Sequence, residues 1–206
     1  SPDYVLIHEK EKEKFIKLII KNIIKFYSNN SINSTSYCRI VNNNHFRRVK
    51  ELIDNAKLHG GDILYGGKTN KEKNYIEPTL IENISKKSKI YNQEIFGPIL
   101  PIFTFKDIND SISFINEKEK PLALYIFSNN KKNVNKILNE TSSGGVCINH
   151  STLHYSNYNL PFGGIGNSGF GKCHGIYGFK EFSNQKSVLK QFSSFSPTDL
   201  LVPPYN

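Results

Sequence analysis

The sequence predicts an α/β protein in which a mostly parallel sheet is flanked by helices. Short apolar runs typical of strands alternate with segments of helical periodicity from residue 4 to residue 149. The run LALYIFS at residues 122–128 is continuously apolar, as expected of a strand that is covered on both faces. Strands that alternate with helices in this way favour parallel pairing through crossover helices.

The N-terminal segment predicts one strand and one amphipathic helix. YVLIH at residues 4–8 is a short apolar strand. In residues 11–27, apolar side chains recur at helical spacing between lysines, which predicts a helix with one apolar face. The recurring apolar residues are Phe15, Ile16, Ile19, Ile20, Ile23 and Ile24.

A second helix is expected within residues 42–61, and three short β-rich runs follow it. His45 or a neighbouring Asn can cap the start of the helix, and Gly60 and Gly61 end it. The runs are DILYGG at 62–67, YIEPTLI at 75–81 and PILPIFTF at 98–105.

Two further helices alternate with strands before the rhythm stops at Asn149. The helix at 106–118 carries its apolar residues at helical spacing, and Asn130 caps the helix at 130–141. Strands are predicted at 122–128 and 144–149. Beyond Asn149, residues 150–186 show no sustained period and residues 187–192 predict a late strand.

Composition excludes several classes of protein. The chain has 27 Lys and Arg against 18 Asp and Glu, a formal net charge of +9, but the lysines are spread over the whole chain. No stripe of basic residues, zinc spacing or aromatic strand pair suggests nucleic-acid binding, and no metal site is predicted. No run of about 18 apolar residues predicts a membrane span. Three cysteines without a C-x-x-C pair favour a reducing, cytoplasmic location.

The stretch PFGGIGNSGFG contains the spacing G-x-G-x-x-G at Gly164, Gly166 and Gly169. A dinucleotide-binding fingerprint requires a buried strand before it, a helix opening at it and an acid about 20 residues further on. Pro161 and several Asn residues precede the glycines, further glycines follow them, and residues 184–190 hold no acid. The glycines instead indicate a tight loop in which the backbone passes close to other backbone or to a ligand.

Several collinear motifs resemble the C-terminal part of aldehyde dehydrogenases, most closely the class 3, fatty-aldehyde branch. PFGGIGNSGFG resembles the family's P-F-G-G-x-x-x-S-G-x-G, and QEIFGP at 93–98 resembles E-E-I-F-G-P with Gln93 in the first acidic position. CRIVNNNHFRRV at 38–49 resembles that branch's G-R-I-x-N-x-x-H-F-x-R, with Cys38 in the Gly position. KPLALYIFSNN and ETSSGGVCIN resemble the corresponding strand, helix and strand, and the resemblance reaches about residue 191.

The resemblance implies an NAD- or NADP-dependent oxidation of an aldehyde, fatty or aromatic, to the carboxylic acid. In the family a cysteine thiolate forms a thiohemiacetal, a hydride leaves to the nicotinamide, and water hydrolyses the thioester with the help of a glutamate base. The family's nucleophile lies two residues before the segment that SPDYVL resembles, so no catalytic residue is expected from Ser1 onward. Met is absent even at position 1, which also suggests a fragment. Without the nucleophile and the base, such a fragment is expected to be inactive alone.

Three functional positions carry over from the family to this chain, and four further positions fall in or near the family's substrate funnel. Glu94 corresponds to the glutamate that binds the hydroxyls of the nicotinamide ribose, and Phe96 corresponds to the aromatic residue beside the nicotinamide ring. Phe162 corresponds to the phenylalanine that walls the catalytic pocket. The remaining positions, in or near the substrate funnel of the class 3 branch, are Asn149, Tyr155, Ser156 and His174.

The resemblance also implies an organisation and a partner. Residues 1–160 would form the catalytic α/β core, 161–186 a glycine-rich return loop, and 187–206 an oligomerisation strand and tail. The strand near Ser187–Gln191 would join the sheet of a second subunit, giving a homo-oligomer, expected to be a dimer. A membrane-associated parent would require an apolar tail beyond Asn206.

Two alternative functions do not involve this reaction. It could be a catalytically silent family fragment that serves as a structural or oligomerisation subunit. A Cys/His nucleophile inside the chain, Cys147 with His150 or Cys173 beside His174, is disfavoured because Cys147 lies in an apolar strand and sequence neighbours rarely form such a pair.

Overall fold

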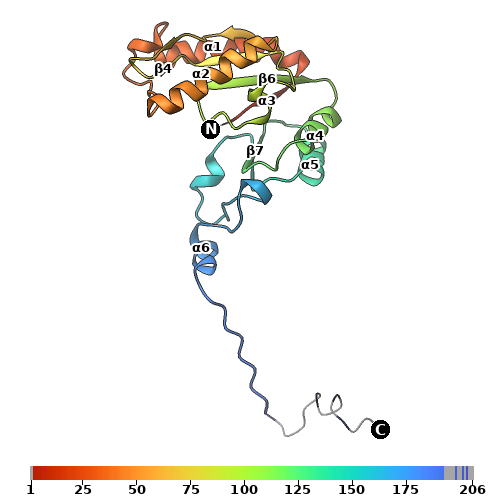
Figure 1. The fold of residues 1–206 in the computed structure, drawn as a ribbon. Coiled ribbons are helices and arrows are strands. Elements are labelled where there is room, and N and C mark those ends of the chain that lie inside the picture. Colours follow the sequence, from red (N-terminus) through yellow and green to blue (C-terminus); the bar gives the residue numbers. More distant parts are fainter. Residues whose placement is uncertain (1, 193–197, 199–200, 202, 204–206) are drawn as a thin grey trace.

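The computed structural model describes residues 2–192, 198, 201 and 203 (Figure 1). The described α-helices are α1 (Lys12–Tyr27), α2 (Asn43–Leu58), α3 (Lys89–Asn92), α4 (Ile108–Asn116), α5 (Lys131–Glu140) and α6 (Gly175–Glu181). The described strands are β1 (Val5–His8), β2 (Asp62–Tyr65), β3 (Thr69–Asn70), β4 (Tyr75–Ile76), β5 (Thr79–Glu82), β6 (Ile99–Phe105), β7 (Ala123–Ile126) and β8 (Gly145–Ile148). Short 3-10 turns are η1 (Glu9–Glu11), η2 (Ser31–Asn33), η3 (Leu153–Ser156) and η4 (Gly166–Ser168).

The strands form one larger sheet and two small ones. The larger sheet has the order β1-β6-β5-β2, with β6 parallel to both of its neighbours and β2 antiparallel to β5. Strands β3 and β4 form an antiparallel pair, and β7 and β8 form a parallel pair. The predicted, mostly parallel α/β architecture is therefore confirmed. Within the described residues, however, β7 and β8 do not join the larger sheet.

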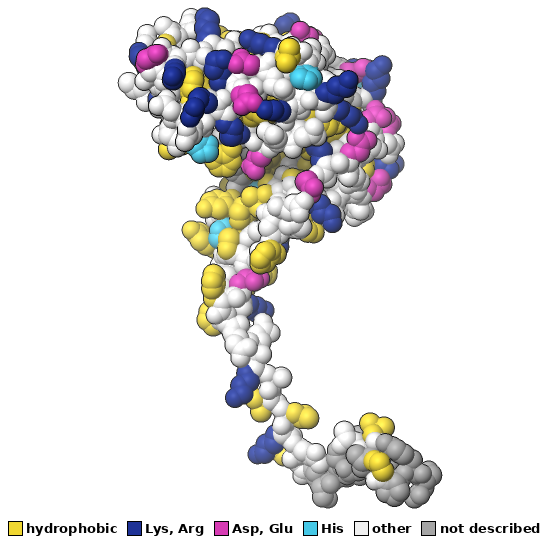
Figure 2. Space-filling model, viewed as in Figure 1, with side chains coloured by type: hydrophobic (Ala, Val, Ile, Leu, Met, Phe, Trp, Pro, Cys, Tyr) yellow, Lys and Arg dark blue, Asp and Glu magenta, His cyan; other side chains and the backbone are white. Residues whose placement is uncertain are grey.

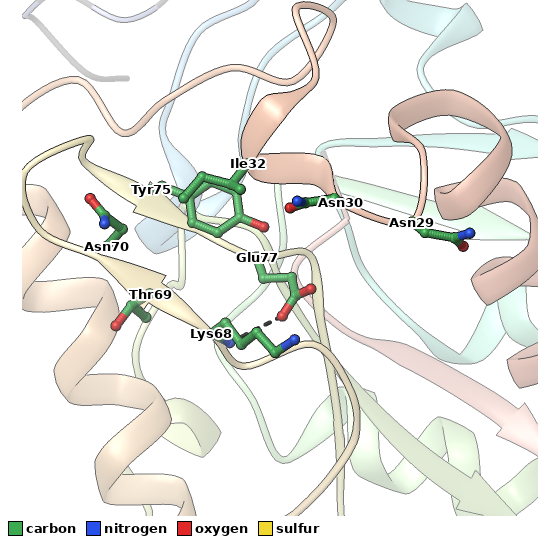
Figure 3. Close-up of a pocket in the computed structure, with 8 residues that line it drawn as sticks. All are labelled: Asn29, Asn30, Ile32, Lys68, Thr69, Asn70, Tyr75 and Glu77. Atoms are coloured by element: carbon green, nitrogen blue, oxygen red, sulfur yellow. Dashed lines mark hydrogen bonds between the residues drawn. The ribbon is translucent and has the colours of Figure 1, made fainter.

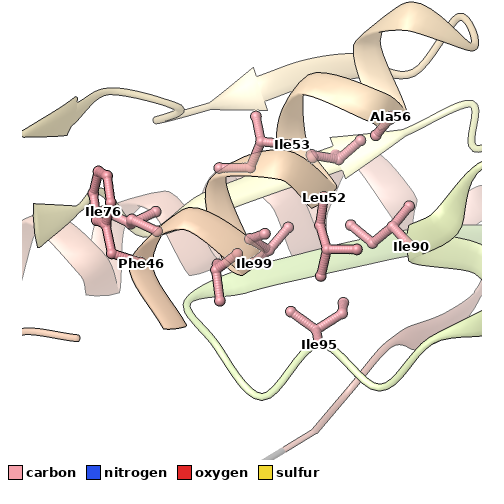
Figure 4. Packing of buried hydrophobic residues seen from close by; sticks show 10 residues of the cluster. Phe46, Leu52, Ile53, Ala56, Ile76, Ile90, Ile95 and Ile99 are labelled. Atoms are coloured by element: carbon pink, nitrogen blue, oxygen red, sulfur yellow. The ribbon is translucent and has the colours of Figure 1, made fainter. Parts of the chain in front are cut away.

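The main core lies where helix α2 packs on the larger sheet (Figure 4). The 3.6-residue spacing of apolar residues on α2 directs one face of the helix inward. Along that face, Val49, Leu52 and Ile53 are at most 2% exposed, and they meet strand residues such as Ile81 and Ile99. The predicted helix is therefore confirmed, and residues spaced three and four apart along it form its buried face.

A second, smaller core joins helices α4 and α5 to strands β7 and β8. Ile112 and Val134 from the helices pack with Ile126 from β7, together with half-buried Leu124. The expectation that residues 122–128 are covered on both faces is wrong for the described chain. Only Ile126 in β7 is buried, and Phe127 is 69% exposed, because the helices cover a single face of this two-stranded sheet.

Most element boundaries follow the expected capping residues. The side chain of Asn42 accepts a hydrogen bond of 2.9 Å from the backbone N–H of His45, so a neighbouring Asn and not His45 caps α2. Asn130 accepts hydrogen bonds from the first turn of α5, as predicted. Gly60, with φ of +88°, follows the end of α2 and accepts the left-handed conformation that ends many helices.

Helix α6 was not predicted, because glycines recur in its sequence about once per turn. The structure nevertheless forms seven helical residues over Gly175–Glu181, with Gly178 inside them. The carboxylate of Glu181 accepts a hydrogen bond of 3.1 Å from the backbone N–H of Lys172, which ties this short helix to the preceding loop. Tertiary contact thus overrides the weak intrinsic helix propensity of glycine.

Residues 183–192 extend away from the rest of the described chain (Figures 1 and 2). No strand forms within 183–192 in the described structure, and Val188 and Leu189 are 80% and 97% exposed. The predicted pairing of this segment with a second subunit stays a prediction, and most of the predicted tail lies outside the described residues. Among the residues the structure describes, no helix is long and apolar enough to cross a membrane.

Helix α2 offers a matched pair of leucines with which to test the main core. Leu52→Ala should lower the free energy of unfolding by about 2–5 kcal/mol, because it leaves a cavity at a site that is 1% exposed. Leu58→Ala, in the same helix at 81% exposure, should change it by less than about 0.5 kcal/mol. Urea unfolding of both variants measures the difference, and equal losses would contradict this assignment of the core.

Candidate active-site groove

A groove of about 2110 Å³ runs between the larger sheet and the β7–β8 pair. Its walls include residues of β1 and β7, the loop at 93–97, and the segment around η3. Hydrophobic side chains gather beneath the larger sheet, where the chain narrows (Figure 2). The groove therefore brings together segments as far apart in the sequence as β1 and η3.

One wall of the groove carries Glu94 and Phe96 on a short loop between α3 and β6. Both side chains are exposed, and Phe96 is 83% exposed. Between them, Ile95 is 1% exposed and belongs to the main core. Phe96 has φ of +43°, in the left-handed region that residues other than glycine seldom adopt. The loop thus buries one side chain and turns its two neighbours outward.

Two charged side chains hold this loop from outside, and a third contacts the helix α3 that precedes it. The guanidinium of Arg48 donates to the carbonyl oxygens of Glu94 (3.2 Å) and Ile95 (2.6 Å). The carboxylate of Asp3 accepts from the backbone N–H of Ile95 at 2.8 Å. Lys118 donates to the carbonyl oxygen of Tyr91, and its ammonium lies 3.8 Å from the centre of the Tyr91 ring.

Burial shifts the pKa values of the groups around this loop. Burial raises the pKa of Asp3, although the hydrogen bond from Ile95 opposes that shift. Burial lowers the pKa of Lys118, against the attraction of Asp3. Burial, together with the charge of Asp3, raises the pKa of Tyr4 to about 12. These shifts indicate a partly desolvated zone where the N-terminal segment meets the groove.

The opposite wall is a cluster of aromatic and imidazole rings. The Phe162 ring lies 5.0 Å from Tyr155 and 5.8 Å from His174, centre to centre, and 5.6 Å from His154. His154 also meets the Tyr125 ring at 5.8 Å. The structure therefore brings together three of the predicted site residues, Phe162, Tyr155 and His174. Sequence reasoning missed His154, because a single histidine in an aperiodic segment gives no signal.

His154 is the side chain of this cluster with the most unfulfilled hydrogen-bonding capacity. It is 8% exposed, and neither ring nitrogen has a hydrogen-bond partner within the described residues. Burial lowers the pKa of His154 below its ordinary value of 6.5. A neutral, buried imidazole is consistent with the apolar rings around it.

Asn149 and Ser156 lie near this wall but outside the ring cluster. The side-chain oxygen of Asn149 accepts from the backbone N–H of Ser128 at 2.9 Å, and its amide donates to the Ser128 carbonyl at 3.2 Å. Its side chain therefore joins the segments that follow β7 and β8. Ser156 ends η3, next to Tyr155. Substrate contact by either residue stays a prediction.

The glycine-rich segment holds the Phe162 wall by close backbone contact. A Cβ added at Gly144 would lie 2.2 Å from the carbonyl oxygen of Gly163, and one at Gly164 would lie 2.0 Å from that of Ser168. The ammonium of Lys172 donates to the carbonyl oxygens of Gly144, Gly163 and Gly164 at 2.7–3.2 Å. The glycines thus permit backbone to approach backbone, as the sequence predicts, and one lysine satisfies the converging carbonyls.

Within the described residues, neither cysteine–histidine pair is joined by a hydrogen bond between the sulfur and the imidazole ring. His150 pairs with the carbonyl oxygen of Ser151, and His174 stacks on Phe162. Cys173 is exposed and its backbone bridges Phe162. Within the described residues, no group of three or more His, Cys, Asp or Glu side chains could hold a metal ion.

A second, polar cavity of about 480 Å³ lies beside the β3–β4 pair (Figure 3). Glu77, which is 9% exposed, accepts there from the backbone N–H of Lys68 at 3.2 Å. The hydroxyl of Tyr75 pairs with that of Ser31 at 2.6 Å. These bonds connect the β3–β4 pair to η2, so the contacts of this cavity are those of a structural junction.

Comparisons with known proteins agree with the motifs. The profile of the aldehyde dehydrogenase family matches residues 1–188. The chain is 40% identical over 205 residues to 4,4'-diaponeurosporen-aldehyde dehydrogenase of Staphylococcus aureus, covering 100% of this chain and 44% of that protein. It is 42% identical to aldehyde dehydrogenase family 3 member A2 of Rattus norvegicus, covering 99% and 41%. The rat dimeric, NADP-preferring aldehyde dehydrogenase is 42% identical over 92% of this chain and 41% of its own length.

Solved structures show the same fold. A substrate-bound structure of Staphylococcus aureus AldH has a TM-score of 0.85 and 38% identity, covering 96% of this chain and 44% of that one. An NAD-dependent aldehyde dehydrogenase from Sinorhizobium meliloti has a TM-score of 0.84 and 25% identity, covering 95% and 39%. The chain thus spans less than half the length of the relatives and structures that it matches.

The buried imidazole predicts a dependence of stability on pH. Because the pKa of His154 is lower in the folded than in the unfolded chain, the unfolded chain binds the proton first as pH falls below 6.5. The free energy of unfolding should therefore fall from pH 7.5 to 5.5 more steeply in the wild type than in His154→Phe, by up to about 1.4 kcal/mol per pH unit. His45→Gln, at an exposed histidine, should keep the wild-type slope. Equal slopes for the wild type and His154→Phe, measured by urea unfolding, would contradict this assignment.

Proposed function

This chain belongs to the aldehyde dehydrogenase family, and on that premise we propose that it forms part of an NAD(P)-dependent enzyme that oxidises an aldehyde to the carboxylic acid. One observation carries the proposal. Glu94 and Phe96 on one side, and Phe162 and Tyr155 on the other, line a single groove although they come from segments far apart in the sequence. By resemblance to the family, Glu94 and Phe96 would contact the cofactor, and Phe162 and Tyr155 would enclose the substrate.

The loop at 93–97 has the chemistry required on the cofactor side. An exposed carboxylate accepts hydrogen bonds from a vicinal diol, which suits Glu94 to the nicotinamide ribose. The exposed ring of Phe96 offers an apolar surface beside the nicotinamide. Bound NAD or NADP supplies the acceptor for the hydride that leaves the substrate carbon. Glu94 and Phe96 would hold and orient that acceptor.

The ring cluster has the chemistry required on the substrate side. Phe162 and Tyr155 present apolar edges to the groove, which favours an aliphatic or aromatic aldehyde over a charged one. Among the relatives, one is named aldehyde dehydrogenase family 3 member A2, and another is named for the aldehyde 4,4'-diaponeurosporen-aldehyde. Asn149, Ser156 and His174 are proposed as funnel residues or neighbours of the funnel.

We assign the nucleophile and the base to a part of the protein that precedes residue 1. A cysteine two residues before Ser1 would attack the carbonyl carbon and form a carbon–sulfur bond. Loss of the hydride from that carbon gives a thioester, which water hydrolyses to the acid as an upstream glutamate accepts the proton. The relatives are more than twice as long as the matched segment, which supports this division. The 206 residues alone would then be inactive.

The extended segment at 187–192 supports assembly with a second copy. Val188 and Leu189 are exposed in a single chain, and an extended strand with apolar side chains can add to a neighbouring sheet edge. A relative is named as dimeric. We therefore propose a homodimer in which this segment crosses to the partner subunit.

The cofactor side is tested by Glu94→Gln in the complete enzyme. The substitution keeps size and removes the charge, so the KM for the cofactor should rise and hydride transfer should slow by roughly 10-fold or more, with an unchanged melting temperature. Glu72→Gln, at an exposed acid in the β3–β4 connection, is the matched control and should leave both constants unchanged. Unchanged kinetics in Glu94→Gln would refute the ribose role.

The catalytic assignment is tested by the intact mass and N-terminal sequence of the native protein. A cysteine should lie two residues before Ser1, after a long α/β segment. Its replacement by Ala should abolish turnover while cofactor affinity is retained, because the thiolate forms the bond to the substrate. A native chain that lacks this cysteine would instead favour the alternative of a silent structural subunit.

A further inference from the structure

The loop at 93–97 is held in a conformation that its own sequence does not favour. Phe96 has φ of +43°, and its ring is 83% exposed, so neither local geometry nor burial of this side chain stabilises the turn. Burial of Ile95 fixes one residue of the loop. The direction in which Glu94 and Phe96 project therefore depends on contacts made by the loop backbone.

Arg48 makes the most extensive of these backbone contacts. Two nitrogens of one guanidinium donate to two successive carbonyl oxygens, those of Glu94 and Ile95. A planar fork can bind two neighbouring acceptors at once, whereas the single ammonium of lysine lacks that fixed spacing. The Asp3 carboxylate completes the set by accepting from the N–H of Ile95.

The position of Arg48 is itself fixed by the main core. The next residue, Val49, is fully buried, and a Cβ added at Gly97 would lie 2.9 Å from the Val49 side chain. Helix α2 and the end of the loop are thus in close contact, and Arg48 reaches across from the rigid helix. Within the described residues, the adjacent Arg47 donates to the side chain of Asn44 in the same helix at 2.6 Å.

We propose that Arg48 is a positioning residue for the cofactor. By fixing the carbonyl groups of Glu94 and Ile95, it sets the direction of the Glu94 carboxylate and the Phe96 ring into the groove. The proposal rests on the proposed function of Glu94 and Phe96 and adds to it the residue that orients them. Arg48 itself contacts no reacting atom; it acts through the loop.

The experiment compares Arg48→Gln, Arg48→Lys and Arg47→Gln in the complete enzyme. For each protein, isothermal titration gives the dissociation constant of NAD and NADP, steady-state kinetics give KM and kcat, and hydrogen exchange reports the amides of residues 93–97 without cofactor. The melting temperature separates local from global effects.

We expect Arg48→Gln to weaken cofactor binding and raise the cofactor KM by roughly 10- to 100-fold, because a small displacement of binding groups has large effects. Amide exchange at 93–97 should accelerate while the melting temperature stays near the wild-type value. Arg48→Lys should resemble Arg48→Gln more than the wild type, because charge alone does not restore the fork. Arg47→Gln should match the wild type in every measurement.

Two outcomes would overturn the proposal, and Glu94→Gln distinguishes them. If Glu94→Gln weakens cofactor binding but Arg48→Gln changes neither binding nor exchange at 93–97, Arg48 does not position the loop. If Glu94→Gln leaves cofactor binding unchanged, the proposed function of the loop fails, and the role of Arg48 toward the cofactor fails with it.

Discussion

Helix α2 buries Val49, Leu52 and Ile53 against the larger sheet, and this contact fixes the wall of the groove that carries Glu94 and Phe96. The burial of several large apolar side chains on one helix contributes more to stability than any single polar contact in the chain. Ile95, within the loop at 93–97, and Ile99, just after it, belong to the same core, so the core anchors this loop. Two charged side chains then restrain the loop backbone through hydrogen bonds. Arg48 reaches it from α2, and Asp3 reaches it from the N-terminal segment.

The sequence predicted the elements well where one period dominates. The helices expected within 42–61 and at 130–141 correspond to α2 and α5, and an asparagine caps each of them, as expected. Helix α6 was missed because its formation depends on contact with the preceding loop, which no local pattern reports. The cover expected on both faces of β7 was wrong because an apolar run shows that a face can be buried but not what lies against it.

The sequence could indicate the motif residues of the candidate site, but not the residues that hold them in position. Glu94, Phe96 and Phe162 were identified because they stand in motifs that resemble a known family. Arg48 stands in such a motif too, but only the structure shows that it contacts a loop 46 residues away. Asp3 and Lys118 give no sequence signal at all, since single charged residues near a strand or a helix end are normally solvated.

The close backbone contacts at Gly144 and Gly164 make these two positions less tolerant of substitution than a position that carries chemistry. At an exposed functional position such as Glu94, replacement by a shorter acid or by an amide leaves a folded protein. At Gly144 the smallest side chain would overlap a carbonyl oxygen of the neighbouring segment, so no gradual step leads away from glycine. Change at these glycines is therefore limited by backbone contact, and new specificities would have to arise in the side chains that line the groove.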